Sequence, residues 1–320
     1  MMSVVVYLTM YIVPKATGDI GRLCFVPFGK NYFAQFDSLL PKDTLFSTLT
    51  TLEELKAVKT EVLTIGDSFS ARKREGYQNF MSLKGINVAN CDRRMFVNQF
   101  QFAYNILKCG YVDSTNTKYI LVECAERGIV KKMKEFKESK TAIVYKSENA
   151  NQPKVSNIWS LARARDFIMY KCGLVTPILE TDLDNEFFSC PNYSQKLFFM
   201  KDDLHYLRIK EADGKAILKT YKTLYDFAES KHIKLLLLVA VDKYDLYQNK
   251  IVNNHFPKKE INEDMRRLFG NSGSNHLIFS KDFLLPHINK DEKDVFWAND
   301  THWSTIGAEI VANGIVEYLN

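Results

Sequence analysis

Three side chains of the kinds that cooperate in acyl transfer occur at two places in this sequence: Ser68, Asp300 and His302. A serine hydroxyl becomes a competent nucleophile when a base takes its proton and a third group orients that base. Asp300 and His302 are two positions apart, and residues at that spacing in an extended turn project to the same side. The carboxylate can then orient the imidazole, whose other nitrogen accepts the serine proton. The pattern indicates a serine nucleophile with an Asp–His pair.

Ser68 lies in the stretch Gly66-Asp67-Ser68, directly after an apolar run at residues 61–65 that predicts a strand. Residues 71–84 then predict a helix. In open α/β sheets, ligands bind beyond the carboxyl ends of the strands, and a backbone N–H at a helix N-terminus can face a developing oxyanion. The position suits a nucleophile, but it also suits a serine that only caps the helix.

Asp300 and His302 precede the last predicted helix, residues 304–319, in the stretch FWANDTHWSTIGA. Trp303 could pack against a sugar ring or against the core, and a lone histidine beside a tryptophan can equally be structural. The serine and the Asp–His pair together are more specific than either alone. A doubly wound sheet can bring the end of its first strand and the start of its last helix to one site.

Apolar runs alternate with helical periodicities along most of the chain, which indicates β-α-β units and a parallel sheet. The expected fold class is α/β: a three-layer sandwich with a central parallel, flavodoxin-like sheet and an insertion between the third and fourth core strands. A long helix is expected at residues 204–230, after the insertion. The expected core strands are residues 61–65, 86–89, 118–124, 234–241 and 276–280.

Two regions depart from this alternation. Residues 1–43 form an N-terminal apolar segment and a linker expected to drape over the domain, and residues 44–320 form the expected catalytic domain. The insertion is expected at residues 135–200, with a helix near residues 157–170 and a loop-like stretch at residues 181–194. From its place in the chain, we expect the insertion to cap the site.

The start of the chain, residues 1–13, is almost entirely apolar and carries no charge. About 20 apolar residues are needed to span a bilayer as a helix. The run also lacks the basic start and small-residue cleavage site of a signal peptide. It is either the tail of a truncated N-terminal membrane anchor, which would place the protein in the cell envelope, or a buried first strand or helix.

The net charge of +5 comes from interspersed acidic and basic residues, without a nucleic-acid recognition motif. Two basic clusters, residues 72–74 and 131–140, are either solvated helix faces or a positive rim for an acidic polysaccharide. None of the six cysteines forms a C-x-x-C pair, which argues against a zinc ribbon or a thioredoxin motif. Cys91 and Cys124 lie in apolar runs and are expected to be buried thiols.

Two motifs in this sequence resemble those of a known enzyme superfamily. The segment IGDSFS resembles the GDS block of the SGNH-hydrolase superfamily. The segment NDTHWSTIGAEIVANGI resembles the Asp-x-His-Trp block of its alginate O-acetyltransferase-like branch. Residues 119–127 and 241–247 resemble two further stretches of that branch, and the likeness covers residues 60–127 and 204–320. In the alginate enzymes the Asp–His block precedes the serine block, whereas here the serine comes first, as in ordinary SGNH hydrolases.

The resemblance leaves the oxyanion donors other than the Ser68 N–H open. The glycine of the superfamily's second block and the Gly-x-Asn of its third are not evident; Asn90 follows the second predicted strand, and Glu123, Glu126 and Arg127 stand at the end of the third. Asn90 and Arg127 are therefore candidates for oxyanion or substrate contacts, as Trp303 is for substrate. The alternative for Arg127 is a salt bridge to Glu123 or Glu126.

The resemblance implies an SGNH-type O-acetyltransferase that acetylates a cell-envelope or exported polysaccharide through an acetyl-Ser68 intermediate. A carbohydrate O-acetyl esterase would use the same triad, and a non-catalytic glycan-binding or assembly protein could have kept the fold. The expected partners are a carbohydrate substrate and a membrane-bound acetyl donor, without nucleic acid. No metal or nucleotide cofactor is implied, because the sequence lacks H-E-x-x-H, G-x-x-x-x-G-K-[ST] and G-x-G-x-x-G.

Overall fold

The computed structural model of this protein describes residues 18–24, 32, 34–138, 169, 172–174, 177–273 and 276–319. The apolar start of the chain, residues 1–13, and almost all of the helix expected near residues 157–170 lie outside these ranges. Of the helices within them, none combines the length and the apolar character that crossing a bilayer requires.

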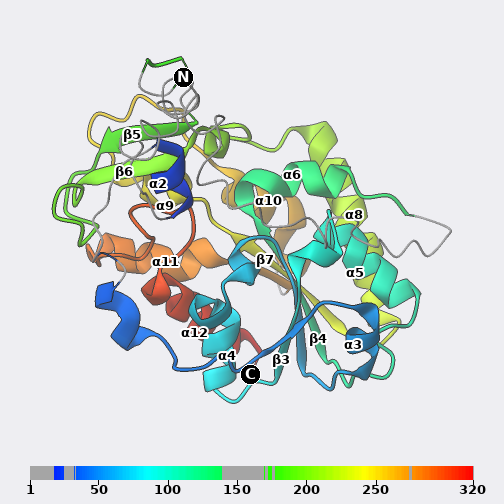
Figure 1. Ribbon diagram of the computed structural model, residues 1–320. Coiled ribbons are helices and arrows are strands. Elements are labelled where there is room, and N and C mark those ends of the chain that lie inside the picture. Colours follow the sequence, from blue (N-terminus) through cyan, green and yellow to red (C-terminus); the bar gives the residue numbers. More distant parts are fainter. Residues whose placement is uncertain are drawn as a thin grey trace, which may run out of the picture.

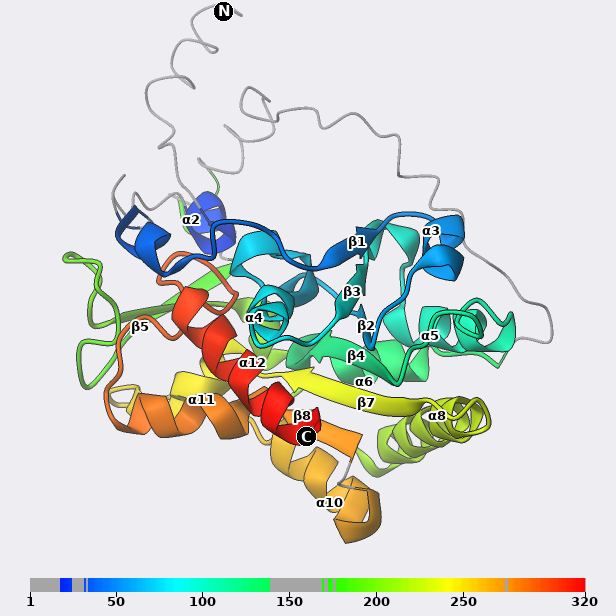
Figure 2. The ribbon, with the colours of Figure 1, turned by 90° about the horizontal axis from the view of Figure 1, so that it is seen from below.

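Six parallel strands form the central sheet (Figure 1), and their spatial order is β1-β3-β2-β4-β7-β8, as Figure 2 shows. Without the edge strand β1, the order is that of a flavodoxin-like sheet, second-first-third-fourth-fifth, and it confirms the expected fold class. The strands are β1 Ser47–Leu49, β2 Val62–Ile65, β3 Val88–Cys91, β4 Tyr119–Ala125, β7 Lys234–Ala240 and β8 Leu277–Phe279.

Helices cover both faces of the sheet and complete the three layers (Figure 2). One face carries α4 Tyr77–Leu83, α9 Lys243–Tyr247, α11 Ser280–Asn289 and α12 Thr305–Leu319. The other carries α3 Leu52–Ala57, α5 Gln99–Lys108, α6 Glu126–Lys134, α8 Glu211–Glu229 and α10 Ile261–Gly273.

Successive residues of the central strands enter two different cores. In β4, Leu121 packs into the core on the α12 side, while Ile120 and Val122 pack into the core on the α8 side. Because both faces are buried, the strands read as continuous apolar runs rather than alternating ones. Cys91 and Cys124, at the ends of β3 and β4, are free and buried, as expected from their apolar context.

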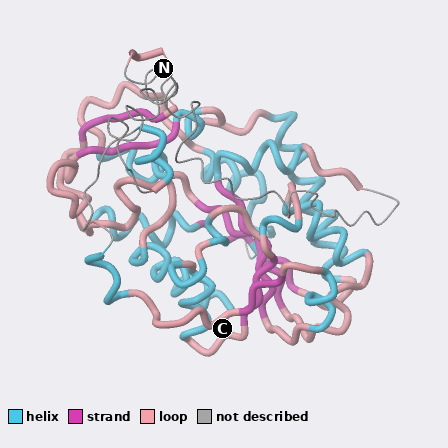
Figure 3. Tube along the Cα trace, viewed as in Figure 1, coloured by secondary structure: helices cyan, strands magenta, loops and turns pink. Residues whose placement is uncertain are grey.

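The insertion after β4 contains a separate two-stranded antiparallel sheet, set apart from the central strands in Figure 3. It consists of β5 Ile178–Asp182 and β6 Lys196–Met200, so the loop expected from residue 181 starts too early. The charged side chains that read as loop lie on the exposed face, where Lys196 pairs with Glu180 and Asp182. The short helix α2 Asp19–Cys24 lies against this hairpin (Figure 1).

The segment after β2 is less helical than expected. Residues 71–84 were predicted as one helix, but two single-turn 3-10 helices, Phe69–Ala71 and Lys73–Glu75, come first. Lys73 has a positive φ of 45° and Gly76 is extended, so α4 can only start at Tyr77. Similarly, α8 begins at Glu211, seven residues after the predicted start at residue 204, because a 3-10 turn at Lys201–Leu204 and an extended Lys210 precede it.

Candidate active site

Ser68 is presented at the carboxyl end of β2, where the chain turns through Gly66 and Asp67. The neighbours of β2 in the sheet are β3 and β4, so this edge is the point at which the strand order reverses and ligands commonly bind. Ser68 precedes the 3-10 turn, but its side chain makes no capping hydrogen bond. The geometry therefore does not support a serine that acts only as a helix cap.

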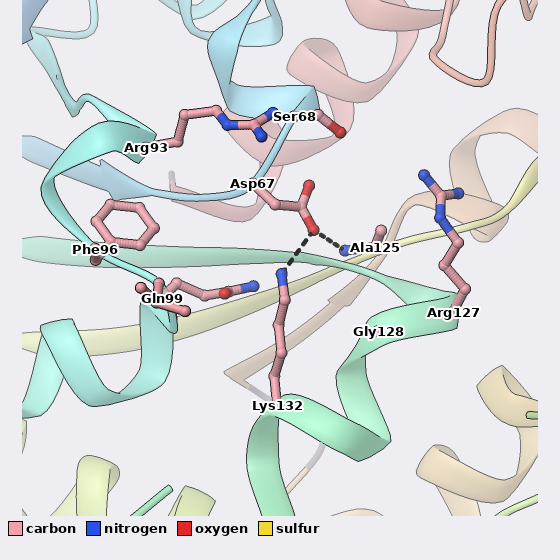
Figure 4. A pocket seen from close by; sticks show the side chains of 10 residues that line it. Asp67, Ser68, Arg93, Phe96, Gln99, Ala125, Arg127, Gly128 and Lys132 are labelled. Carbon is pink, nitrogen blue, oxygen red and sulfur yellow. Dashed lines mark hydrogen bonds and ion pairs between the residues drawn. The ribbon is translucent and has the colours of Figure 1, made fainter. Parts of the chain in front are cut away.

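A cavity of about 410 Å³ lies beside Ser68, between the loops that follow β2, β3 and β4 (Figure 4). Its floor is formed in part by Ala125 and Gly128, where β4 passes into α6. Three basic side chains and one acidic side chain give the lining a positive balance: Arg93, Arg127, Lys132 and Asp67. The half-buried Ser68 thus faces a space large enough for part of a small ligand.

Asp300 and His302 lie in a narrow loop that connects α11, the helix after β8, to α12. The loop is closed by a bridge between Phe296 and Trp303. His302 Nδ1 lies 2.5 Å from Asp300 Oδ1, and the His302 backbone N–H donates to the same oxygen at 3.2 Å. The carboxylate therefore fixes the imidazole with Nδ1 toward itself and leaves Nε2 on the far side of the ring.

Two contacts join the Ser68 loop to the Asp–His loop. Arg72, four residues after Ser68, places its guanidinium 2.8 Å from Asp300 Oδ1. The Phe69 ring, adjacent to Ser68, lies 4.8 Å from the His302 ring, centroid to centroid. Burial alone would raise the pKa of Asp300, but the hydrogen bond and charge of His302, together with Arg72, hold that pKa well below its ordinary value. Asp300 is thus a stable anion behind the imidazole.

His302 Nε2 is buried and has no hydrogen-bond partner among the described residues. The Ser68 hydroxyl and the His302 imidazole do not hydrogen bond to each other in this structure. A buried imidazole nitrogen without a partner is costly in a core that serves only stability. Free enzymes often form the nucleophile–base hydrogen bond only when substrate is present.

Two residues that sequence reasoning did not select hold the Asp–His loop in place. Lys243, fully buried, donates to the carbonyl oxygens of Trp297 at 2.7 Å and Ala298 at 2.9 Å, with Asp300 O at 3.4 Å. From α2, Asp19 accepts from the Thr301 backbone N–H at 2.8 Å and from the Thr301 hydroxyl. The signal for Lys243 was its place in a stretch that resembles the alginate branch; for Asp19 the sequence offered none.

Asp19, Asp300 and His302 could in principle hold a metal ion, since ligand atoms from the three lie within 4.8 Å of one another. The same atoms already bond to Thr301 and to one another, and Arg72 supplies a positive charge at Asp300. A cation here would have to compete with that guanidinium. The hydrogen-bonded arrangement accounts for these side chains without a metal.

Asn90 and Trp303, two further residues predicted to contact the oxyanion or the substrate, are both buried. Asn90, on β3, is buried and uses its amide to donate to Ser70 O at 3.1 Å while its oxygen accepts from Thr64. Trp303 is 4% exposed, and its ring centroid lies 4.5 Å from that of Phe69. Of the two alternatives for Trp303, a sugar ring or the core, this packing matches the core. Neither geometry shows a contact to a substrate, and both roles stay predictions.

Arg127 lines the cavity and forms ion pairs, but not with the expected glutamates. Its guanidinium lies 2.8 Å from Asp242 and 3.4 Å from Asp203, two fully buried carboxylates. Lys259 Nζ lies 2.6 Å from the other oxygen of Asp242. Arg127 is therefore held by a buried ion-pair network and also lines the cavity (Figure 4).

One curated protein is similar to part of this chain. It is the probable alginate O-acetylase AlgJ of Pseudomonas syringae pv. tomato, 28% identical over 162 residues. The match covers 49% of this chain and 36% of that relative, so the chain spans about a third of the relative's length. The similarity is consistent with an acetyltransferase-like family. No family model matches the chain, and no solved structure was found that matches it.

Proposed function

We propose that this protein transfers acetyl groups to a polysaccharide, with Ser68 as nucleophile, His302 as general base and Asp300 as the group that orients His302. One observation carries the proposal: the Arg72–Asp300 ion pair joins the Ser68 loop to the Asp–His loop. Ser68 lines a cavity, and His302 Nε2 is buried with no hydrogen-bond partner among the described residues. The similarity to a probable alginate O-acetylase supports the acetyl group and the polysaccharide.

In the first half-reaction, Ser68 Oγ attacks the carbonyl carbon of an acetyl ester while His302 Nε2 takes the hydroxyl proton. The bond between the acetyl carbon and the donor oxygen breaks, and the imidazolium returns the proton to the leaving donor. An acetyl-Ser68 ester remains. In the second half-reaction, His302 takes the proton of a sugar hydroxyl, whose oxygen attacks the acetyl carbon. The bond between that carbon and Ser68 Oγ breaks, and the imidazolium returns the proton to Ser68 Oγ.

The electrostatics around His302 support this order of proton transfers. Asp300 stays ionised because Arg72 and His302 lower its pKa against the effect of burial. A fixed negative charge at Nδ1 stabilises the imidazolium that forms when Nε2 accepts a proton. The oxyanion of the tetrahedral intermediate would accept a hydrogen bond from the Ser68 backbone N–H. Arg127 and Asn90 are the further hydrogen-bond donors that we propose.

From the apolar residues 1–13 and the similarity to a probable alginate O-acetylase, we propose a cell-envelope location, with an acetyl donor delivered by a membrane-bound partner. This part of the proposal is tested by fractionation of cells that express the full chain. Recovery only in the soluble cytoplasmic fraction would contradict it. The catalytic proposal does not depend on that result.

The decisive experiment measures acetate release and acetyl transfer from p-nitrophenyl acetate, with an alginate oligosaccharide and a neutral glucan oligosaccharide as acceptors. Ser68→Ala and His302→Ala are each expected to lose about 10³-fold or more in turnover, and the double variant little beyond that, because triad members act as a unit. Ser114→Ala is the matched control, since Ser114 is exposed and lies before the amino end of β4.

Acetylated oligosaccharide formed only with intact Ser68, and an acetyl adduct on the peptide that contains Ser68, would support the transferase. Acetate release without acetylated sugar would favour a carbohydrate O-acetyl esterase with the same triad. Turnover that survives in Ser68→Ala would refute the mechanism. Glycan binding that is equal in the wild type and Ser68→Ala, with no acetyl adduct in either, would indicate a binding protein.

A further inference from the structure

A fully buried glutamate lies directly beneath the Ser68 loop and has no role in the mechanism above. Glu123 is on β4, next to β2 in the sheet, and its exposed fraction is 0%. Its Oε2 accepts from the Ser70 hydroxyl at 2.9 Å. A Cβ atom at Gly66 would lie 2.4 Å from that same oxygen. The carboxyl group thus touches the loop on both sides of Ser68.

The second oxygen of this carboxyl, Oε1, receives no hydrogen from a described residue. Among the described residues, no lysine, arginine or histidine forms an ion pair with Glu123, whereas the neighbouring Asp67 pairs with Lys132. A fully buried carboxyl group with one hydrogen-bond donor and no paired cation is favoured in its protonated, neutral form. Asp67 already accepts from the Ala125 backbone N–H at 2.9 Å and from Lys132 Nζ at 3.3 Å. Asp67 is therefore the anion, and Glu123 carries the proton.

The direction of both pKa values agrees with this assignment. Burial raises the pKa of Glu123 well above its ordinary value, and the neighbouring charge of Asp67 raises it further. Burial would also raise the pKa of Asp67, but Lys132 and the hydrogen bond from the Ala125 backbone N–H help to lower it to about 2. With a proton on Glu123, the side chains of Glu123, Asp67 and Lys132 together carry no net charge.

We propose that Glu123 is a positioning residue that holds the Ser68 loop through a protonated carboxyl group, whose Oε2 accepts from the Ser70 hydroxyl and lies against the turn at Gly66. The inference rests on the proposed role of Ser68. Gly66 precedes Ser68 by two residues and Ser70 follows it by two, so a single uncharged side chain contacts the loop on both sides of the nucleophile. Loss of the proton would place a second carboxylate beside that of Asp67.

The charged and titratable groups that face Glu123 come from each element packed against it. Asp67 and the Ser70-bonded Tyr77 face it from the loop and from α4. Lys132 faces it from α6, and the Cys124 thiol lies next to it on β4. Burial raises the pKa of Tyr77 well above its ordinary value. Lys132 is thus the one cation in this set, and it already pairs with Asp67.

The test compares Glu123→Gln with Glu123→Met. A glutamine is neutral and can accept from Ser70, so Glu123→Gln should retain turnover within about 3-fold, whereas Glu123→Met cannot accept and should lose about 100-fold because the loop is misplaced. In the wild type, turnover should fall at alkaline pH as Glu123 loses its proton, and Glu123→Gln should not show that fall. A glutamine variant as impaired as the methionine variant would overturn the proposal.

Thermal unfolding against pH provides a readout that does not need activity. An acid whose pKa is raised on folding stabilises the native state at low pH, and this contribution is lost as the pH rises above its ordinary value of 4.5. The melting temperature of Glu123→Gln should therefore gain on that of the wild type as pH increases. A constant difference would refute a protonated Glu123. If Ser68→Ala retains activity, the proposed function fails, while this unfolding comparison still decides the role of Glu123.

Discussion

Lys243 gives the sharpest test of how the Asp–His loop is held. Its buried ammonium donates to the carbonyl oxygens of Trp297 and Ala298, at 2.7 and 2.9 Å, and approaches Asp300 O at 3.4 Å. Lys243→Met keeps an apolar stem of similar length and removes these bonds. We expect the loop to lose its fixed position and turnover to fall, while the rest of the fold persists.

Lys243→Met should affect the free energy of unfolding and the turnover by very different amounts. A carbonyl left buried without a partner costs about 1–3 kcal/mol, so losing the partner of the two at 2.7 and 2.9 Å would destabilise the protein by about 2–6 kcal/mol. Burying an ammonium group costs several kcal/mol as well, and that cost disappears in the methionine variant. The two terms oppose each other, so the free energy of unfolding should change by no more than about 2 kcal/mol. A displacement of the His302 loop of about 1 Å should still lower turnover about 100-fold.

The assay pairs acetyl-ester turnover with urea unfolding for the wild type, Lys243→Met and a control. Lys222→Met is the control, because Lys222 is 76% exposed on α8 and pairs only with Asp226 in the next turn among the described contacts. The control should match the wild type in both measurements. A Lys243→Met protein with wild-type turnover would refute the reasoning, and so would a turnover loss fully explained by the unfolded fraction.

Three further variants test other parts of the site. Gly66→Ala should lower stability by about 1–3 kcal/mol in urea unfolding, because the new Cβ would lie 2.0 Å from a serine hydroxyl oxygen. Arg72→Met should lower turnover about 10-fold and stability by about 1–3 kcal/mol, since it leaves Asp300 with one charged partner fewer in a site shielded from water; an unchanged kcat would argue against the ion pair. Burial and then Asp242 raise the pKa of Asp203 to about 7. Because folding raises this pKa, protonation of Asp203 stabilises the fold below about pH 4, and this stabilisation is lost as the pH rises to 7. The melting temperature of Asp203→Asn should therefore increase relative to that of the wild type between pH 5 and pH 8.

The strands were predictable because each central one is buried on both faces and reads as an unbroken apolar run. The strands that were missed are short or carry exposed, charged residues, so their sequences resemble those of surface loops. β1 is three residues long with two of them exposed, and it follows no periodicity. In β5, the exposed carboxylates that pair with Lys196 give the strand the composition of a loop.

In the site, the contact between Asp300 and His302 was predictable because two residues at that spacing meet through local geometry alone. Arg72 was grouped with its basic neighbours as a solvated helix face or a rim, and the structure instead pairs it with Asp300. Lys243 and Glu123 were visible as charged residues in apolar surroundings, but their partners come from distant segments. A single sequence does not say which buried charges face one another.

The contact between Asp19 and Thr301 joins residues 282 positions apart. Contacts of such sequence separation form late, because the intervening chain must be ordered before they can close. During synthesis, the loop that carries Ser68 emerges long before the loop that carries His302 exists, because 234 positions separate the two residues. Under the proposed mechanism, the nascent chain would therefore display the serine without its base. The order of synthesis would then keep the proposed nucleophile inactive until the Asp–His loop has been made and has folded against it.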